Sequence, residues 1–119
     1  MSICMKERTT RRVTAIVVDE NDVGLDVAVI TAIKMTLYDK KTSDIINSRD
    51  AQDIKNANNV TISSVGALVW TVQVLDNIIV TATEVLEHHV ALIEWTWNVG
   101  NNSGHDEIDI FVQNTVKVP

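Results

Sequence analysis

Hydrophobic and polar residues alternate along several short stretches of the chain. In Ile30–Tyr38 the apolar residues Ile33, Met35 and Leu37 occupy every second position and polar residues fall between them. This period of two predicts a β-strand that is buried on one face. The same alternation marks four further stretches, Val13–Val18, Ala67–Val74, His88–Val99 and His105–Val112. Shorter candidates are Ile45–Ser48, Val60–Ser63 and Ile78–Val80.

Turn residues separate these stretches at intervals of roughly 8–15 residues, which is typical of β-sandwiches. Asp19–Gly24 and Asp39–Asp44 are the clearest turns, because Asn, Asp and Gly suit them. The chain is rich in Val, Ile and Thr and has one proline, a composition that favours strands. The sequence therefore predicts a single all-β domain, an antiparallel β-sandwich of about seven strands.

The most distinct local element is a hairpin near the C-terminus. His88–Val99 and His105–Val112 flank Gly100–Gly104, and glycines readily adopt the positive φ values that such loops need. The alternation places Trp95 and Ile110 on buried faces, and that of Ala67–Val74 does the same for Trp70. We expect these three residues in the core.

Arg49–Asn59 breaks the strand pattern because most of its residues are polar. It predicts a loop, with one helical turn as an alternative, and long loops are frequent contact surfaces. Its candidate partner-binding residues are Arg49, Asp53, Lys55 and Asn56.

Charge is unevenly distributed along the chain. The net charge is −6, yet residues 1–12 carry +3, so the remainder carries −9. We expect a flexible basic arm over residues 1–12, a sandwich over residues 13–113 and a tail over residues 114–119. The basic arm could contact an acidic partner or DNA, whereas a solvated terminus is the commoner explanation; the acidic body speaks against nucleic-acid binding. Candidate contact residues at the two ends are Arg8, Arg11, Arg12, Val116, Lys117 and Val118.

The single cysteine, Cys4, excludes a disulfide within the chain. The sequence has neither the apolar segment of a signal peptide nor a run long enough to span a membrane. These features predict synthesis and residence in the cytoplasm.

His88 and His89 are the first candidates for metal binding or acid–base chemistry. Adjacent residues of a strand point to opposite faces, so the pair cannot hold one ion together, although His89 and His105 could approach across the hairpin. Zinc-type spacing is missing, and the acidic turn Asp19–Asp26 does not match a calcium loop. No serine lies in a G-x-S-x-G turn. We therefore expect no catalytic residue, no metal site and no cofactor.

Several segments together resemble small structural proteins of tailed bacteriophages. They are RDAQDIKNANNVTISSVG (49–66), ALVWTVQVLDNIIV (67–80), EVLEHHVALIEWTWNVG (84–100) and HDEIDIFVQNTVKV (105–118). The resemblance covers residues 13–118 and implies an immunoglobulin-like β-sandwich in a virion component. It implies no catalytic residue, and the chain lacks the cysteine pair of true immunoglobulin domains.

The resemblance implies a non-enzymatic subunit of a phage particle, made in the host cytoplasm and located at the neck or head–tail junction or serving as a decoration protein. Its partners would be other virion proteins, such as portal, adaptor, capsid or tail subunits, in an oligomeric ring or lattice and without a membrane. The alternative is a carbohydrate- or receptor-binding sandwich, in which Trp95 or Trp97 near the hairpin tip would offer a ring face to a sugar.

Overall fold

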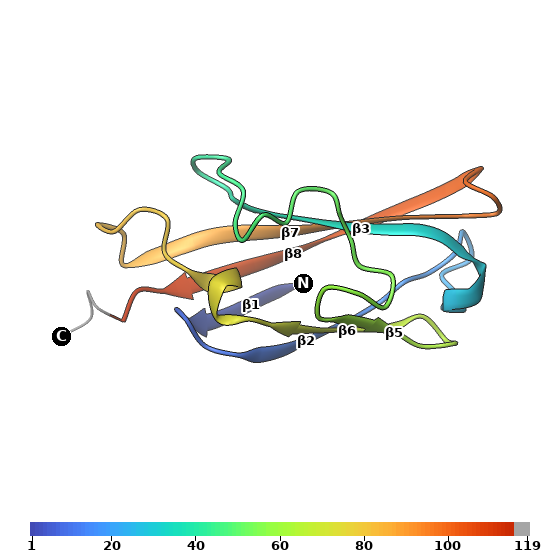
Figure 1. Ribbon diagram of the computed structural model, residues 1–119, viewed down its shortest axis with the longest axis horizontal. Helices are drawn as coiled ribbons and strands as arrows, with labels where there is room; N and C mark the ends of the chain where they lie inside the picture. Colours follow the sequence, from blue (N-terminus) through green and yellow to red (C-terminus); the bar gives the residue numbers. More distant parts are fainter. Residues whose placement is uncertain (116–119) are drawn as a thin grey trace.

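The computed structural model describes residues 1–115, which form two β-sheets packed face to face (Figure 1). The molecule is elongated, measuring 50 × 23 × 23 Å. Two short 3₁₀ helices, η1 (Val27–Val29) and η2 (Val74–Asn77), connect strands. The predicted all-β sandwich is confirmed. No helix in the described residues is long and apolar enough to cross a membrane.

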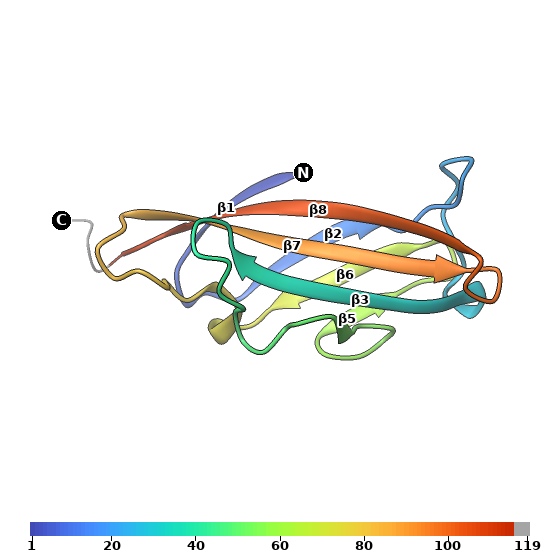
Figure 2. The same ribbon diagram turned by 90° about the horizontal axis from the view of Figure 1, so that it is seen from above.

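The larger sheet has five strands in the order β1-β8-β7-β3-β4. Their bounds are β1 (Ser2–Lys6), β3 (Ile30–Asp39), β4 (Gln52–Asp53), β7 (Leu86–Trp97) and β8 (Asn102–Gln113). The smaller sheet has the order β2-β6-β5, with β2 (Arg11–Ile16), β5 (Val60–Ile62) and β6 (Ala67–Val72). Figure 2, viewed from above, shows β3, β7 and β8 crossing over the smaller sheet.

The two sheets enclose one hydrophobic core. The alternation in β3 buries Ile33, Met35 and Leu37, as predicted, because these side chains face the smaller sheet. Trp70, Trp95 and Ile110 are also buried, at 0%, 5% and 2% exposure, which confirms the predicted core positions. The indole N–H of Trp95 donates to the Val18 carbonyl at 3.0 Å, as buried tryptophans usually do, whereas Trp70 Nε1 is buried without a hydrogen-bond partner among residues 1–115.

The predicted hairpin is confirmed as the longest pairing in the sheet. β7 and β8 pair antiparallel from Leu86↔Gln113 to Trp97↔Asn102. The loop is shorter and lies earlier than expected, because Asn98, Val99 and Gly100 take positive φ values of 54°, 54° and 82° and turn the chain there. The residues from Asn102 onward, which we expected in the loop, already pair as β8.

The prediction of a flexible arm over residues 1–12 is wrong. β1 pairs in parallel with β8 from Ser2↔Asp109 to Lys6↔Gln113, and its residue Met5 is buried in the core. Arg11 and Arg12 are the first residues of β2 and pair with β6. The sandwich therefore begins near the N-terminus, has eight strands within residues 1–115 and is not wholly antiparallel.

Three shorter predictions also change. Ile45–Ser48 is not a strand, although Ile45 forms a single bridge to Tyr38. Ile78–Val80 lies outside the strands and packs against the core. The Arg49–Asn59 loop is confirmed as mostly irregular, with the two-residue β4 inside it.

Candidate functional site

Of the basic residues predicted near the N-terminus, Arg8 lies in the turn between β1 and β2, and Arg11 and Arg12 begin β2. Arg8, Arg11 and Arg12 are all exposed. Arg11 Nη1 donates to the Cys4 carbonyl at 2.6 Å, which holds that side chain against β1. The turn lies toward one end of the long axis, drawn in dark blue at the left of Figure 1. Lys40 and Lys41, in the loop after β3, add positive charge at the same end.

Arg49 does not belong to this surface, which corrects its prediction as a contact residue. Its side chain is 2% exposed, and its Nε and Nη2 donate to the two oxygens of buried Asp76 at 2.6 and 3.1 Å. Nη1 donates to Gln52 Oε1 at 2.8 Å and to the Asn58 carbonyl at 2.9 Å. The guanidinium lies 5.7 Å from the centre of the Trp70 ring. Arg49 therefore anchors its loop to the interior.

The other candidates of this loop are only partly available to a partner. Lys55 Nζ donates to the Ile30 carbonyl at 2.7 Å, and Asn56 Oδ1 accepts from the Ile62 amide at 2.7 Å. Asp53 is exposed, and its carboxylate accepts from the Lys55 amide at 3.0 Å. The structure brings these residues together in one loop but uses two of the side chains to hold it. Val116, Lys117 and Val118 lie outside the described residues.

The opposite end of the molecule is acidic and carries an open groove of about 680 Å³. The groove lies between the turn after β2 and the tip of the β7–β8 hairpin, at the right of Figure 1. Its acidic lining residues are Asp19, Glu20 and Asp106, and Trp97 forms part of its apolar wall. Asp19 Oδ1 already accepts from the amides of the same turn at 2.8 and 3.1 Å, so this oxygen shapes the turn.

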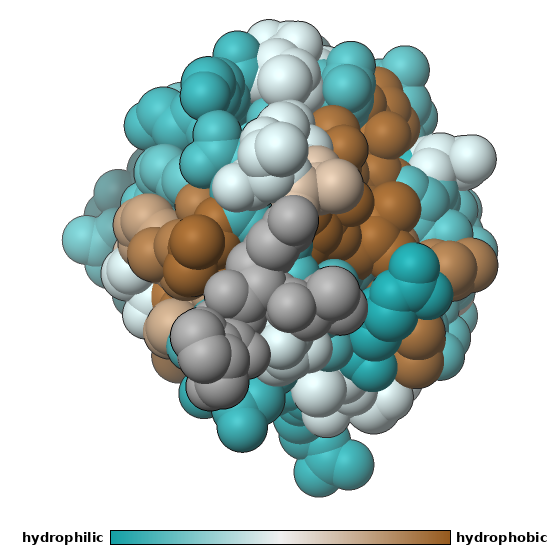
Figure 3. Space-filling model, turned by 90° about the vertical axis from the view of Figure 1, so that its left-hand side faces the viewer, coloured by the Kyte–Doolittle hydropathy of each residue, from teal (hydrophilic) through white to brown (hydrophobic). Residues whose placement is uncertain are grey.

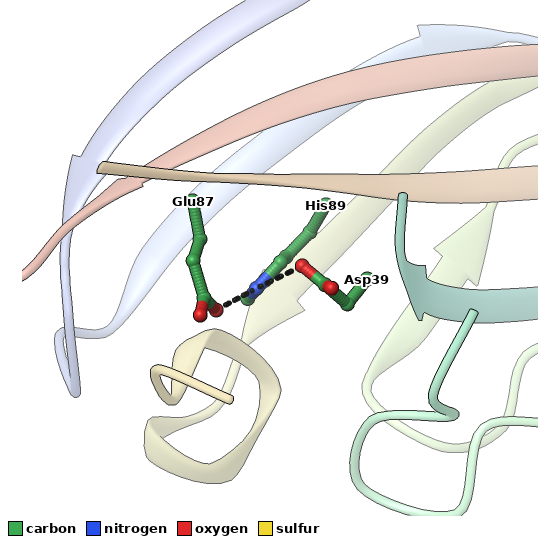
Figure 4. A group of neighbouring side chains, drawn as sticks. All are labelled: Asp39, Glu87 and His89. Carbon is green, nitrogen blue, oxygen red and sulfur yellow. Dashed lines mark hydrogen bonds and ion pairs between the residues drawn. The ribbon is translucent and has the colours of Figure 1, made fainter. Parts of the chain in front are cut away.

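A second group of chemically interesting side chains is buried between the sheets at the basic end. Asp39 is the last residue of β3, while Glu87 and His89 lie two residues apart on β7 (Figure 4). Asp39 is directly opposite His89 in the register of the two strands. His89 Nε2 is 2.8 Å from Glu87 Oε1 and 3.7 Å from Asp39 Oδ1. We call these three residues the Asp–Glu–His cluster.

Backbone and hydroxyl donors fix both carboxylates of the cluster. Glu87 accepts from the amides of Val80 and Thr81 at 2.8 and 2.5 Å. Asp39 Oδ2 accepts from the amide and hydroxyl of Thr42 at 3.0 and 2.8 Å. A pocket of about 200 Å³ borders the cluster and is lined by Asp39, Glu87 and Thr81 among others.

The two adjacent histidines lie on opposite faces, as the strand pattern predicts. His89 is fully buried, whereas His88 is half-buried on the outer face, where its ring stacks on Phe111 with centroids 4.5 Å apart. The expected approach of His89 to His105 is wrong, because the register pairs His89 with Ile110 and His105 with Glu94. The signal that would have found the cluster is Glu87-x-His89, since alternate residues of a strand share a face.

Two exposed ion pairs flank the cluster. A hydrogen bond from His88 Nε2, 2.7 Å from Asp109 Oδ1, lowers the pKa of the Asp109 carboxyl below its ordinary value. The hydrogen bond from Lys41 Nζ to Glu84 Oε1, 2.9 Å long, raises the pKa of the Lys41 ammonium. Both pairs lie near the surface, where such contacts contribute little stability.

Comparison of the chain with protein-family models, with curated proteins and with solved structures found no match.

Proposed function

We propose that this protein is a non-enzymatic structural subunit that assembles end to end with copies of itself and with other proteins of a virion. The observation that supports assembly most strongly is the separation of charge along the long axis. The segment that joins β1 to β2 lies toward one end and carries Lys6, Arg8, Arg11 and Arg12 against Glu7, although Asp44 and Glu84 also lie toward this end; the turn after β2 and the hairpin tip lie toward the other end and carry Asp19, Glu20, Asp22 and Asp106 (Figures 1 and 2). A basic cluster and an acidic cluster at opposite ends of one chain favour a head-to-tail contact, which generates rings when the rotation closes.

Exposed apolar side chains at the basic end also support an interface. Figure 3 views this end directly and shows apolar side chains among polar ones. Exposed large residues in the segments near this end are Ile45, Val74, Leu75, Val85 and Leu86, each between 42% and 56% exposed. Soluble monomers rarely leave contiguous apolar patches of large area uncovered, and such patches commonly mark contacts with other proteins.

Strands at the sheet edges offer a second mode of contact. Among the described strands, β1, β4, β2 and β5 each have a neighbour on one side only. Unpaired backbone amides and carbonyls of an edge can pair with a strand of another chain. Partners of the same particle could therefore add to the sandwich without any change in its core.

The immunoglobulin-like type and the phage assignment are parts of this proposal. The orders β2-β6-β5 and β8-β7-β3 correspond to the B-E-D and G-F-C orders of immunoglobulin sandwiches, with β1 added beside β8. The phage context, and with it the neck, head–tail adaptor or decoration role, depends on the resemblance of residues 13–118 alone.

Head-to-tail assembly is tested by reversing the charge of each end in a separate variant and then mixing the two variants. We expect the double variant R11E/R12E, which removes the basic cluster, and the double variant E20K/D106K, which reverses exposed acidic residues of the opposite end, each to remain monomeric. An equimolar mixture should associate again, because each variant then offers what the other lacks. The measurement is light scattering coupled to size exclusion, followed by negative-stain images to detect rings.

Lys34→Glu is the matched control, since Lys34 is exposed on the outer face of β3 and lies at neither end. It should associate like the unmodified protein. A wild-type protein that stays monomeric at millimolar concentration, or a mixture that fails to associate, would contradict head-to-tail assembly.

The groove at the acidic end favours glycan binding as a second candidate function. Trp97 is partly exposed there and lies among Asn101, Asn102 and Asp106, and aromatic rings and amides are common partners of sugars. Trp97→Ala with an unchanged circular-dichroism spectrum should then lose binding on a glycan array. Glycan binding that survives in Trp97→Ala would exclude this groove.

A further inference from the structure

The Asp–Glu–His cluster presents three groups that commonly bind metal ions. One nitrogen and two oxygen atoms, one from each side chain, all lie within 4.8 Å of one another. Two different strands supply them, and the pairing of Asp39 with His89 in the β3–β7 register fixes their relative positions. Figure 4 shows the imidazole of His89 between the two carboxylates.

Burial makes the charge of this cluster unusual. Asp39, Glu87 and His89 are 2%, 4% and 0% exposed. Among the described residues, His89 is the only histidine, lysine or arginine with a side-chain nitrogen within 4.0 Å of either carboxyl group, and Lys41 interacts with Asp39 at longer range. Two carboxyl groups therefore share a site away from water with one imidazole. Buried charges of this kind are normally paired or bound to a metal.

Hydrogen bonding satisfies only one of the two ring nitrogens of His89. Its Nε2 faces both carboxylates, but its Nδ1 is buried without a hydrogen-bond partner among the described residues. A buried polar atom without a partner destabilises the folded state. The imidazole is thus held in the interior by contacts at Nε2 alone, which is the nitrogen aimed into the cluster.

We propose that Asp39, Glu87 and His89 bind one divalent metal ion of the Zn²⁺ class. Tetrahedral zinc with bonds of about 2.0–2.2 Å requires ligand atoms about 3.4 Å apart. The distances of 2.8 and 3.7 Å from Nε2 to the two carboxylates bracket that value. A mixed set of imidazole and carboxylate suits Zn²⁺, whereas Mg²⁺ and Ca²⁺ are bound by oxygen ligands.

The surroundings of the cluster satisfy two further requirements of a metal site. The amides of Val80 and Thr81 and the Thr42 hydroxyl orient the carboxylates from behind, as outer hydrogen bonds do in metalloproteins. The neighbouring pocket of about 200 Å³ gives an ion and a water ligand a route to the cluster. A bound ion would link the end of β3 to the start of β7 within the larger sheet, independently of the proposed assembly.

The experiment is a titration of chelator-treated full-length protein with ZnCl₂ by isothermal calorimetry, repeated with CoCl₂ by absorption spectroscopy. We expect one Zn²⁺ per chain, and a Co²⁺ spectrum of the intensity typical of four- or five-coordinate sites. MgCl₂ should give no heat of binding. Wild-type protein that is folded by circular dichroism yet binds no Zn²⁺ would overturn the proposal.

Adjacent histidines provide a matched pair of variants. His89→Ala should weaken Zn²⁺ binding at least about 100-fold, the upper range seen when even outer partners of a metal are lost. His88→Ala, one residue away on the other face, should bind like wild type. If His89→Ala does not fold, the nearly isosteric Asp39→Asn takes its place with the same expected loss. Equal losses in His88→Ala and the cluster variants would assign the ion to another site and refute the proposal.

Thermal unfolding gives an independent measurement. An ion at 100 times its Kd should raise the Tm of wild-type protein by roughly 10 °C for a domain of this size. The rise should be absent in Asp39→Asn and retained in His88→Ala. A rise of equal size in all three proteins would show binding elsewhere.

Discussion

Arg49 donates hydrogen bonds to side chains and carbonyls of four other residues, and its bidentate pair with Asp76 is almost fully buried. Removing one partner of such a pair leaves the other charge uncompensated in the interior. We expect Arg49→Ala to lower the free energy of unfolding by about 3–5 kcal/mol, measured by urea denaturation. Arg12→Ala, an exposed arginine in β2, is the control and should change it by no more than about 0.5 kcal/mol. Similar values for the two variants would contradict the buried role of Arg49.

Asp109 offers a test of the electrostatics on the outer face. The hydrogen bond from His88 lowers the pKa of its carboxyl, so the folded state favours the ionised form. The stability that this contributes is complete above the carboxyl's ordinary pKa of 3.8 and is lost as the pH falls through the lower folded value. NMR titration should place the pKa of Asp109 below 3.8, and His88→Ala should return it toward that value. An unchanged pKa in His88→Ala would exclude the hydrogen bond as the cause.

At the scale of elements, β1 shows why one strand escaped sequence analysis. Its five residues include only Ile3 and Met5 on the inner face, and basic residues follow immediately. A stretch this short has too few repeats for a period of two to stand out. Its partner, β8, lies about a hundred residues away, and nothing local encodes a parallel pairing over that distance.

Because β1 is part of the sandwich, substitutions of its inner residues should destabilise the domain. Met5 is 5% exposed and belongs to the hydrophobic core, and removing such a side chain usually costs about 2–5 kcal/mol. We therefore expect Met5→Ala to destabilise the domain by about 2–3 kcal/mol in urea. Cys4→Ala, at the neighbouring exposed position, should have little effect. Equal stability of both variants would indicate the flexible arm that the charge pattern had predicted.

The candidate sites differ in how far the sequence reveals them. The exposed arginines were predictable because their charges cluster within twelve residues of one end. The Asp–Glu–His cluster was not, since Asp39 is far from Glu87 in sequence and meets it only through the β3–β7 register. The burial of Arg49 was also not predictable. Its polar neighbours in sequence predict exposure, and its buried partner Asp76 lies 27 residues away.

At the scale of the whole molecule, alternation along the strands was sufficient to predict two layers and their core, including Trp70, Trp95 and Ile110. It did not give the order of strands within each sheet, because that order depends on contacts between distant parts of the chain. Packing of the core does not determine the positions of charged residues on the surface. The separation of basic and acidic ends is therefore a property of the folded shape that alternation does not predict.

This separation makes ionic strength a direct test of the proposed end-to-end assembly. The Debye length falls from about 30 Å in 10 mM salt to about 3 Å in 1 M salt, so a contact between charged ends weakens strongly over that range. We expect the average mass in light scattering to fall with NaCl toward that of a single chain. Association through the apolar residues Val85 and Leu86 would instead persist or grow, because excluded salts strengthen apolar contacts. If the average mass instead rises with salt, and is lower in Leu86→Ser, the interface is formed by the apolar residues and not by the charged ends.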